Sequence, residues 1–332
     1  MILAGDIGGT HARLAFFDAI DGRFSLVSAS VFPSREYSGL DEIVAKFVDT
    51  SNLHPDTACF GIAGPVRNGR VEASNLPWII DSKRLADELK ITKAILINDL
   101  EANAWGIASL GEQDQVALNR VKGMPVGNQA VISAGTGLGE AGLFWNGNGY
   151  EIFASEGGHC DFAPHTELEI ELLRYLVARF GHVSFERIVS GPGLVNVYNF
   201  LRDTHRGEEP QWLTDELAQG DQAATISRAA VAGKNVLAEN ALDLWISIYG
   251  AEAGNLALKL MATGGVFLGG GIAPKIVSKL SSPLFMQAFV SKGRLQPLLE
   301  SIPVKVITND KIALFGAARY AVAKGTPQNS RP

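Results

Sequence analysis

Short apolar runs and longer stretches of helical spacing follow one another along the whole chain. Glycine-rich clusters follow two of the apolar runs, Gly5-Asp6-Ile7-Gly8-Gly9-Thr10 and Gly135-Thr136-Gly137-Leu138-Gly139. A second short apolar run follows each cluster, and alternation of core and solvent positions over so few residues is typical of strands. The pattern therefore predicts two β-hairpins with glycine-rich turns.

The same periodicities predict the other strands and helices. Strands are expected at residues 57–63, 93–97, 264–272 and 304–307, and helices at 40–48, 82–89, 100–110, 166–180, 236–261 and 311–324. The polar stretch 203–222 is interpreted as a loop or insertion of weak structure. Strands that alternate with helices indicate an α/β fold.

Length and composition describe an ordinary globular protein with two domains. The 332 residues are many for one hydrophobic core, and 46% hydrophobic with 19% charged residues is typical of soluble proteins. The two cysteines, Cys59 and Cys160, cannot form a disulfide framework, which agrees with a reducing cytoplasm.

The net charge and the lengths of the apolar stretches indicate which binding partners to expect. A net charge of −6 argues against nucleic acid as a partner, although backbone N–H groups and Mg²⁺ can still hold a small anionic nucleotide. No basic and then apolar segment precedes Asp6, so no signal peptide is expected. The longest mostly apolar stretch, residues 260–274, is too short to span a bilayer, so no membrane partner is expected.

The two glycine clusters are candidates for phosphate binding. Glycine permits positive φ and close approach of a ligand, and two such turns, each with a threonine hydroxyl, suggest loops that grip one polyphosphate from opposite sides. A dinucleotide fingerprint would open a helix, whereas strand-like residues follow Gly9. The Walker and protein-kinase motifs are missing. The remaining alternative is that both clusters are only tight hairpin turns.

Polar side chains follow the strand predicted at 93–97. In open α/β sheets ligands bind beyond the carboxyl ends of the strands, so Asp99 is a candidate to face a ligand. Equally, Asp99 can cap the helix at 100–110. Its neighbour Asn98 offers both a donor and an acceptor, which suits a ligand with several hydroxyls.

A second polar cluster lies at Ser155-Glu156-Gly157-Gly158-His159-Cys160-Asp161, a segment without periodicity. Glu156 and His159 are expected to hydrogen-bond a neutral ligand, and the alternative for His159 is a buried, satisfied histidine. The spacing matches no common zinc site. Further on, three glycines at 269–271 close a strand, which either leaves room for a flat ring such as adenine or makes a tight turn.

Taken together, these motifs resemble the bacterial glucokinases, in the superfamily of sugar kinases, heat-shock chaperones and actin. The resemblance runs nearly end to end and includes Gly181-His182-Val183-Ser184-Phe185-Glu186-Arg187, Ser190-Gly191-Pro192-Gly193-Leu194 and Gly254-Asn255-Leu256-Ala257-Leu258. It implies a two-lobed actin-like ATPase (ribonuclease H-like) fold with a cleft between the lobes. The implied domains are a small α/β domain of residues 1–109 and 308–326, a large domain of residues 110–307, and a tail at 327–332.

The resemblance also implies the site residues. Those implied to bind the sugar are Asn98, Asp99, Glu156, His159, Glu186 and Asn75. Those implied to bind ATP are Asp6, Gly8, Gly9, Thr10, Gly135, Thr136 and Gly137 at the phosphates, and Gly269 and Gly270 beside the adenosine. Asp99 would act as general base on the 6-hydroxyl of D-glucose, and Asp6 would hold Mg²⁺, directly or through water. The implied product is glucose 6-phosphate, in the first step of glycolysis.

The chain departs from the family pattern at two positions. Glu140 follows the second phosphate turn where the family leads us to expect a small apolar residue, and Cys160 stands in place of a common valine. The related ROK sugar kinases carry a cysteine-rich zinc site that two cysteines cannot make, so the resemblance is to the zinc-free glucokinases, with no structural zinc. The family further implies a homodimer.

Two other classes of protein stay open beside the kinase. A sugar-sensing regulator of this fold would carry an N-terminal helix-turn-helix, for which the sequence before the first turn has no room. In a filament or chaperone ATPase, nothing would explain the polar side chains at Asn98, Asp99, Glu156 and His159. Within the kinase class, the pattern does not select among hexoses, or between ATP and polyphosphate as the donor.

Overall fold

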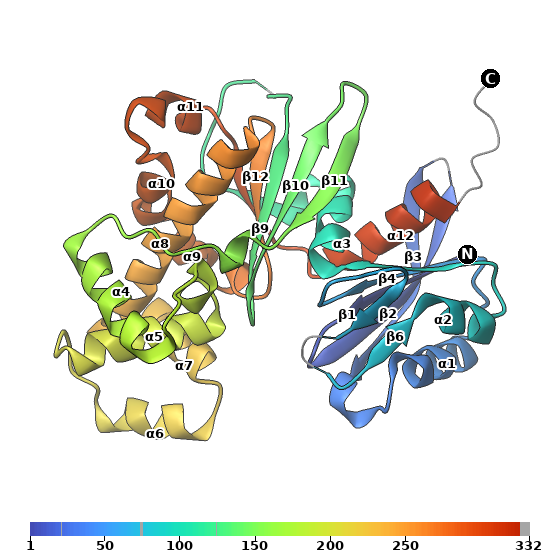
Figure 1. Cartoon of the computed structure of the whole chain (residues 1–332), viewed down its shortest axis with the longest axis horizontal. Coiled ribbons are helices and arrows are strands. Elements are labelled where there is room, and N and C mark those ends of the chain that lie inside the picture. Colours follow the sequence, from blue (N-terminus) through green and yellow to red (C-terminus); the bar gives the residue numbers. More distant parts are fainter. Residues whose placement is uncertain (21, 74–75, 124, 326–332) are drawn as a thin grey trace. The chain divides into compact units, whose positions relative to one another are not determined.

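The structure, a computed structural model, describes residues 1–20, 22–73, 76–123 and 125–325. Contacts divide the chain into two compact units: Met1–Gly111 together with the segment from Asn309 onward, and Glu112–Thr308. The first unit is therefore built from two separate stretches of chain (Figure 1). The tail expected at 327–332 lies outside the described residues.

The first unit is built on a five-stranded sheet with the order β3-β2-β1-β4-β7. Its strands are β1 (Ile2–Ile7), β2 (His11–Ile20), β3 (Arg23–Pro33), β4 (Thr57–Ile62) and β7 (Ala94–Asn98). Strands β1 to β3 form an antiparallel meander, and β4 and β7 run parallel to β1. The first predicted hairpin is thereby confirmed, whereas β3 was not predicted. Strands β5 (Arg70–Glu72) and β6 (Ile79–Asp81) form a separate pair.

Helices cover both faces of this sheet, because alternate residues of its strands point to opposite sides. Leu3 and Ile7 pack with α1 (Leu40–Ser51) and α2 (Ser82–Leu89). Ile2 and Ala4 pack with α12 (Ile312–Gly325) and α3 (Asp99–Gly106) on the other face (Figure 1). Each helix thus buries one apolar side, as the periodicity predicted.

The contact between α3 and α12 gives a test of this packing. A β-carbon at Gly316 would clash with the carbonyl of Ala102 and lie 2.7 Å from the amide nitrogen of Gly106. Alanine is the better helix former, yet overpacking of this kind costs about 1–3 kcal/mol. We expect Gly316→Ala to lower the free energy of unfolding by that amount in urea titrations. Gly149→Ala, with no atom within 4 Å of the new methyl group, is the control and should leave it nearly unchanged; equal stability of the two variants would contradict the packing.

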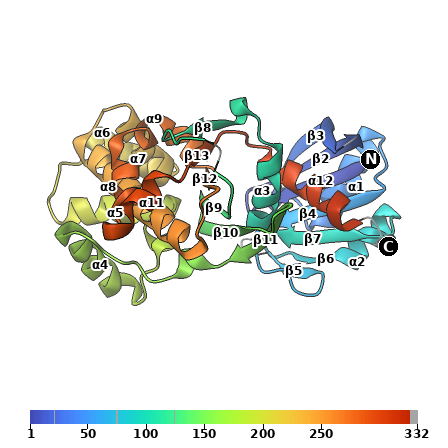
Figure 2. The same cartoon turned by 90° about the horizontal axis from the view of Figure 1, so that it is seen from above.

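The second unit contains a six-stranded sheet with the order β11-β10-β9-β12-β13-β8 (Figure 2). Its strands are β8 (Gln115–Ala117), β9 (Gln129–Ala134), β10 (Leu138–Trp145), β11 (Tyr150–Ser155), β12 (Gly265–Gly269) and β13 (Val304–Ile307). Strands β9 to β11 form an antiparallel meander, and β12 and β13 continue in parallel. This repeats the arrangement of the first sheet, so the two glycine turns, β1–β2 and β9–β10, occupy equivalent positions in the two units.

Helices make up the rest of the second unit. They are α4 (Glu167–Phe180), α5 (Gly191–Asp203), α6 (Gln211–Gln219), α7 (Gln222–Val231), α8 (Val236–Leu260), α9 (Val277–Leu280), α10 (Pro283–Val290) and α11 (Gln296–Glu300). Most residues of the long α8 are buried, and its Tyr249 hydroxyl donates to the carbonyl of Ile132 in β9 at 3.0 Å. None of the helices among the described residues is both long enough and apolar enough to cross a membrane.

Short 3-10 helices connect several of these elements. They are η1 (Ser34–Glu36), η2 (Ile107–Ser109), η3 (Glu112–Asp114), η4 (Gly157–His159), η5 (Phe185–Arg187), η6 (Ala273–Ile276) and η7 (Gly293–Leu295). Two of them, η4 and η5, carry candidate site residues.

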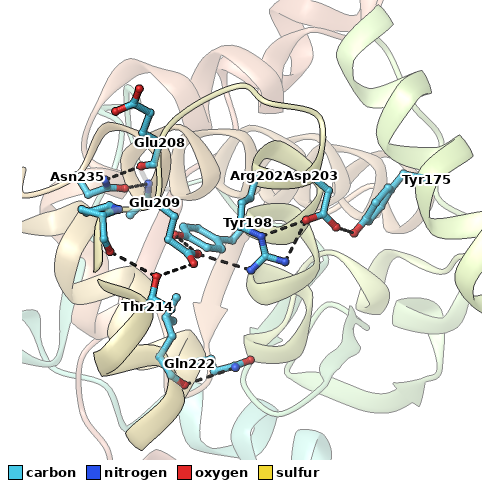
Figure 3. Close-up of polar contacts among 12 residues, drawn as sticks. Tyr175, Tyr198, Arg202, Asp203, Glu208, Glu209, Thr214, Gln222 and Asn235 are labelled. Carbon is cyan, nitrogen blue, oxygen red and sulfur yellow. Dashed lines mark hydrogen bonds and ion pairs between the residues drawn. The ribbon is translucent and has the colours of Figure 1, made fainter. Parts of the chain in front are cut away.

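The prediction of weak structure over residues 203–222 is wrong, because α6 lies within this stretch. Leu213 is fully buried, and Figure 3 shows polar contacts that hold the segment before it. The Glu209 carboxylate accepts hydrogen bonds from the hydroxyls of Tyr198 at 2.8 Å and Thr214 at 2.9 Å. Arg202 lies 3.6 Å from the same carboxylate. These contacts are between polar side chains, so the periodicity of apolar residues could not reveal them.

Candidate functional site

The glycine turn of the first unit is fixed by a buried serine. The hydroxyl of Ser34 donates to the carbonyl of Gly8 at 2.8 Å, and its backbone N–H donates to the carbonyl of Thr10 at 3.0 Å. Within the turn, the N–H of Gly8 donates to the carbonyl of His11 at 3.0 Å. Ser34 follows β3, which was not predicted, so no local pattern pointed to its role.

Asp6 lies in β1 directly opposite Arg13 in β2. Its Oδ2 accepts a hydrogen bond from Nη1 of Arg13 at 3.0 Å. Burial raises the pKa of the Asp6 carboxyl, and the Arg13 guanidinium opposes that shift. The Asp6 side chain remains 19% exposed. A carboxylate of this kind fits Mg²⁺, which in nucleotide sites takes one or two carboxylates besides phosphate and water oxygens. Arg13 was not among the residues predicted from the sequence.

The carboxyl ends of β1, β4 and β7 lie side by side. Ile7 pairs with Ile62, and Ile62 pairs with Asn98, so two strand spacings of about 4.8 Å separate the end of β7 from the first glycine turn. Asp99, the residue after β7, therefore lies at the same edge of the sheet as Gly8. Asn75 lies outside the described residues.

Asn98, and not Asp99, caps helix α3, so the alternative that gave the cap to Asp99 is wrong. The Asn98 Oδ1 accepts from the N–H of Leu100 at 2.8 Å, and its Nδ2 donates to the carbonyl of Gly64 at 3.3 Å. Asp99 is the first residue of α3, partly exposed, and its Oδ1 also accepts from Leu100 N–H, at 2.9 Å.

In the second unit, the structure brings three predicted sugar-binding residues together. Glu156 precedes η4, His159 ends η4, and Glu186 lies in η5. The Nδ1 of His159 lies 3.9 Å from Oε1 of Glu186, and its Nε2 lies 4.0 Å from Oε2 of Glu156. Both distances exceed a hydrogen bond. The side chain of His159 is 59% exposed, so the alternative of a buried, satisfied histidine is wrong.

Glu186 also contacts the second glycine turn. Its Oε2 accepts a hydrogen bond from the N–H of Leu138 at 3.0 Å, immediately after Gly137. The turn itself is closed by the N–H of Gly135, which donates to the carbonyl of Gly137 at 2.9 Å. A hydrogen bond of 2.8 Å from Gly191 N–H to the carbonyl of Gly135 joins the turn to α5. The acidic cluster and the glycine turn thus form one connected site within this unit.

A groove of about 1760 Å³ opens in the second unit beside this turn. Its lining includes Gly135, Thr136, Gly271, Ile272, Lys275 and Arg228. Gly269 pairs with Ser133 at the ends of β12 and β9, which places the turn after β12 next to the turn after β9. The groove is larger than a typical ligand pocket of 300–1,000 Å³. Helices α5 to α7 form the outer wall of the groove. No pattern in the sequence connected these helices with the glycine motifs.

Metal binding elsewhere in the chain would need a cluster of His, Cys, Asp or Glu side chains. Among the described His, Cys, Asp and Glu side chains, no group of three or more could hold a metal ion. Cys59 is buried and Cys160 is exposed, and both are free thiols.

The two units contain matching sheets, each with a glycine turn. One unit adds a polar strand end, and the other adds an acid–histidine cluster. Together these features define the actin-like sugar kinases. The solved structure of a glucokinase from an Antarctic psychrotroph has this fold, with a TM-score of 0.84 and 31% identity over 97% of this chain and 99% of its own. The glucokinase family model matches residues 3–324. The chain belongs to the glucokinase family, and the resemblance and the fold class expected from the sequence are both confirmed.

Two curated relatives agree with this assignment. The glucokinase of Nostoc sp. is 44% identical over 97% of this chain and 98% of its own length. The glucokinase of Trichormus variabilis is 42% identical over the same shares.

Proposed function

We propose that this chain is an ATP-dependent glucokinase that transfers the γ-phosphate of ATP to the 6-hydroxyl of D-glucose, the first step of glycolysis. The observation that carries the proposal is that glucokinases of 42–44% identity match 97% of the chain. The reaction needs positioning and charge stabilisation more than covalent chemistry by the protein. The residues described above can supply both.

Asp99 is the proposed general base. It lies partly exposed at the carboxyl edge of the first sheet, and α3 begins at its backbone. The carboxylate would accept the proton of the 6-hydroxyl as the oxygen attacks the γ-phosphorus. A carboxylate can serve because the proton moves late, when the attacking oxygen has become acidic. Asn98, fixed by its contacts to Leu100 and Gly64, would bind a neighbouring hydroxyl.

Glu156, His159 and Glu186 are proposed to bind other sugar hydroxyls, together with Asn75. The distances of 3.9 and 4.0 Å within this cluster leave acceptors and a donor available around one small ligand. Hydrogen bonds that become buried when a sugar binds discriminate strongly between sugars, since a buried partner left unpaired costs about 1–3 kcal/mol. This cluster is therefore the proposed source of sugar selectivity.

The glycine turns are proposed to hold the ATP phosphates, through Asp6, Gly8, Gly9 and Thr10 in one unit and Gly135, Thr136 and Gly137 in the other. Gly269 and Gly270, next to the groove, would border the adenosine. Asp6 would hold Mg²⁺, directly or through water, and the ion when bound neutralises charge on the β- and γ-phosphates. Backbone N–H groups of the turns would stabilise charge on the transferred group.

Localisation and assembly follow the family resemblance. We propose that the protein acts in the cytoplasm, in agreement with its two free thiols, and that it is a homodimer. Light scattering would then give a mass twice that of the 35.4 kDa chain.

A coupled assay of ADP release, with and without glucose, tests the proposal. We expect turnover that depends on glucose, on ATP and on Mg²⁺, with glucose 6-phosphate as the product. Turnover independent of sugar would indicate an ATPase, and sugar binding without turnover would indicate a sensor. A panel of mannose, fructose and N-acetyl sugars at fixed ATP, repeated with polyphosphate as donor, would then define the specificity.

A further inference from the structure

A pair of buried carboxyl groups lies behind the second glycine turn. Glu140 in β10 is 1% exposed, and Glu252 in α8 is fully buried. Glu140 is also the position at which the chain departs from the small apolar residue expected there. A buried carboxyl group needs partners or a bound proton, because burial disfavours its charged form.

The two carboxyl groups differ in their partners. Glu252 accepts hydrogen bonds from Nδ2 of Asn255 at 2.9 Å and from Nζ of Lys259 at 3.3 Å. Lys292 adds positive charge nearby, because its Nζ donates to Oδ1 of Asn255 at 2.6 Å. In contrast, Oε1 of Glu140 is buried without a hydrogen-bond partner among the described residues. Glu252 therefore has a cation as a hydrogen-bond partner, whereas Glu140 has none in the described part of the chain and is the less compensated carboxyl group of the pair.

The charges around Glu140 favour its neutral form. Burial first, and then the charge of Glu252, raise the pKa of Glu140 to about 8, against the opposing effect of Lys259. Tyr249 of α8 also interacts with Glu140 electrostatically. The strand neighbours of Glu140, Ile132 in β9 and Ser155 in β11, carry no charge. A carboxyl group with this pKa is mostly protonated at pH 7 and mostly ionised at pH 9.

The carboxyl group of Glu140 lies against the segment that carries the sugar-binding candidates. A β-carbon at Gly157 would clash with Oε2 of Glu140 and lie 2.9 Å from its Cδ. The N–H of Gly157 donates to the hydroxyl of Ser155 at 3.0 Å. Gly158 packs equally closely on the carbonyl of Leu138. Residues 138–140 of β10 therefore support η4, and Glu156 and His159 flank the supported glycines.

We propose that Glu140 is a positioning residue of the sugar site, whose neutral carboxyl group under Gly157 holds Glu156 and His159 in place and whose ionisation displaces them. This rests on the proposed glucokinase function. A charge on Glu140 would interact unfavourably with the charge of Glu252, and both groups are buried. The part of α8 around Glu252 is buried, and Gly157 has no side chain to anchor it, so η4 is the element that moves.

The pH dependence of glucose binding tests the proposal. In the wild type we expect the glucose KM to rise about tenfold between pH 7 and pH 9, while the ATP KM stays nearly constant. Glu140→Gln, neutral and of the same size, should keep the wild-type KM at pH 7 and lose this rise. Glu169→Gln is the matched control, because Glu169 is also a buried carboxyl group of this unit, 4% exposed, and should keep the rise.

A second experiment tests the contact without any titration. Gly157→Ala should raise the glucose KM about tenfold and leave the ATP KM nearly unchanged. Shortening the opposing side chain in Glu140→Ala/Gly157→Ala should recover much of that loss, since the two sites are in contact and their effects should not add. A merely structural role of Glu140 would make the double variant worse than either single variant.

The outcomes separate this inference from the proposed function. The role of Glu140 would be overturned if the glucose KM rose equally in the wild type and in Glu140→Gln. Strictly additive effects in the double variant would overturn it as well. In both cases glucose phosphorylation as the proposed function would stand. Absence of glucose phosphorylation in the wild type would overturn the proposed function instead. Glucose titration by calorimetry without ATP measures the same shifts as dissociation constants, so the role of Glu140 is still tested in that case.

Discussion

Asp99→Asn is expected to lower kcat by about 10²- to 10⁴-fold, the range that a general base contributes. Asparagine has the same size, and its Oδ1 can still accept the N–H of Leu100 that Asp99 accepts at 2.9 Å. The start of α3 should therefore be preserved, and only the basicity is lost. Steady-state kinetics should show a glucose KM within a few-fold of the wild type.

Glu101→Gln is the matched control for this variant. It removes a negative charge from the same first turn of α3, two residues further on. We expect kcat to change by less than about twofold in that variant, since general-base catalysis requires direct contact with the hydroxyl. Full activity of Asp99→Asn would remove Asp99 as the base. An equal loss in Glu101→Gln would show that charge at the helix start, and not proton transfer, is responsible.

Much of the fold could be predicted because its signals are local. The hairpins β1–β2 and β9–β10 follow from apolar runs that flank glycine turns, and α8 follows from periodicity over many residues. Strand β3 was missed because it lies at the edge of the sheet and its residues are mostly exposed, so no continuous apolar run marks it. Helix α6 was missed because polar contacts around Glu209 hold it in place.

The candidate site was predictable to a similar extent. Glu156 and His159 stand close together in the sequence, in a glycine-rich segment without periodicity. The approach of Glu186, and its contact with Leu138, depend on the packing of η5 on β10, which no local pattern encodes. Arg13 and Ser34 were missed for the same reason, since Arg13 acts through Asp6 on the neighbouring strand and Ser34 acts through Gly8 in the turn. The family resemblance, and no local pattern, supplied Glu186.

The position of Glu186 between the sugar cluster and the glycine turn leads to the second large effect. We expect Glu186→Gln to raise the glucose KM by about 10- to 100-fold, because hydrogen bonds to charged groups contribute about 1.5–3 kcal/mol. The glutamine Oε1 can still accept the N–H of Leu138, so the turn at 135–137 should keep its geometry. The ATP KM should consequently stay within a few-fold of the wild type.

Glu186→Ala separates the two contacts of this side chain. Alanine removes the charge next to His159 and also leaves the N–H of Leu138 without its acceptor, so we expect both the glucose KM and the ATP KM to rise. Glu167→Gln, on an exposed carboxylate of α4 with a 72% exposed side chain, controls for loss of charge and should change neither constant. The assignment of Glu186 to the sugar would be contradicted by a glutamine variant that alters the ATP KM alone. Its link to the phosphate turn would be contradicted if the alanine variant altered only the glucose KM.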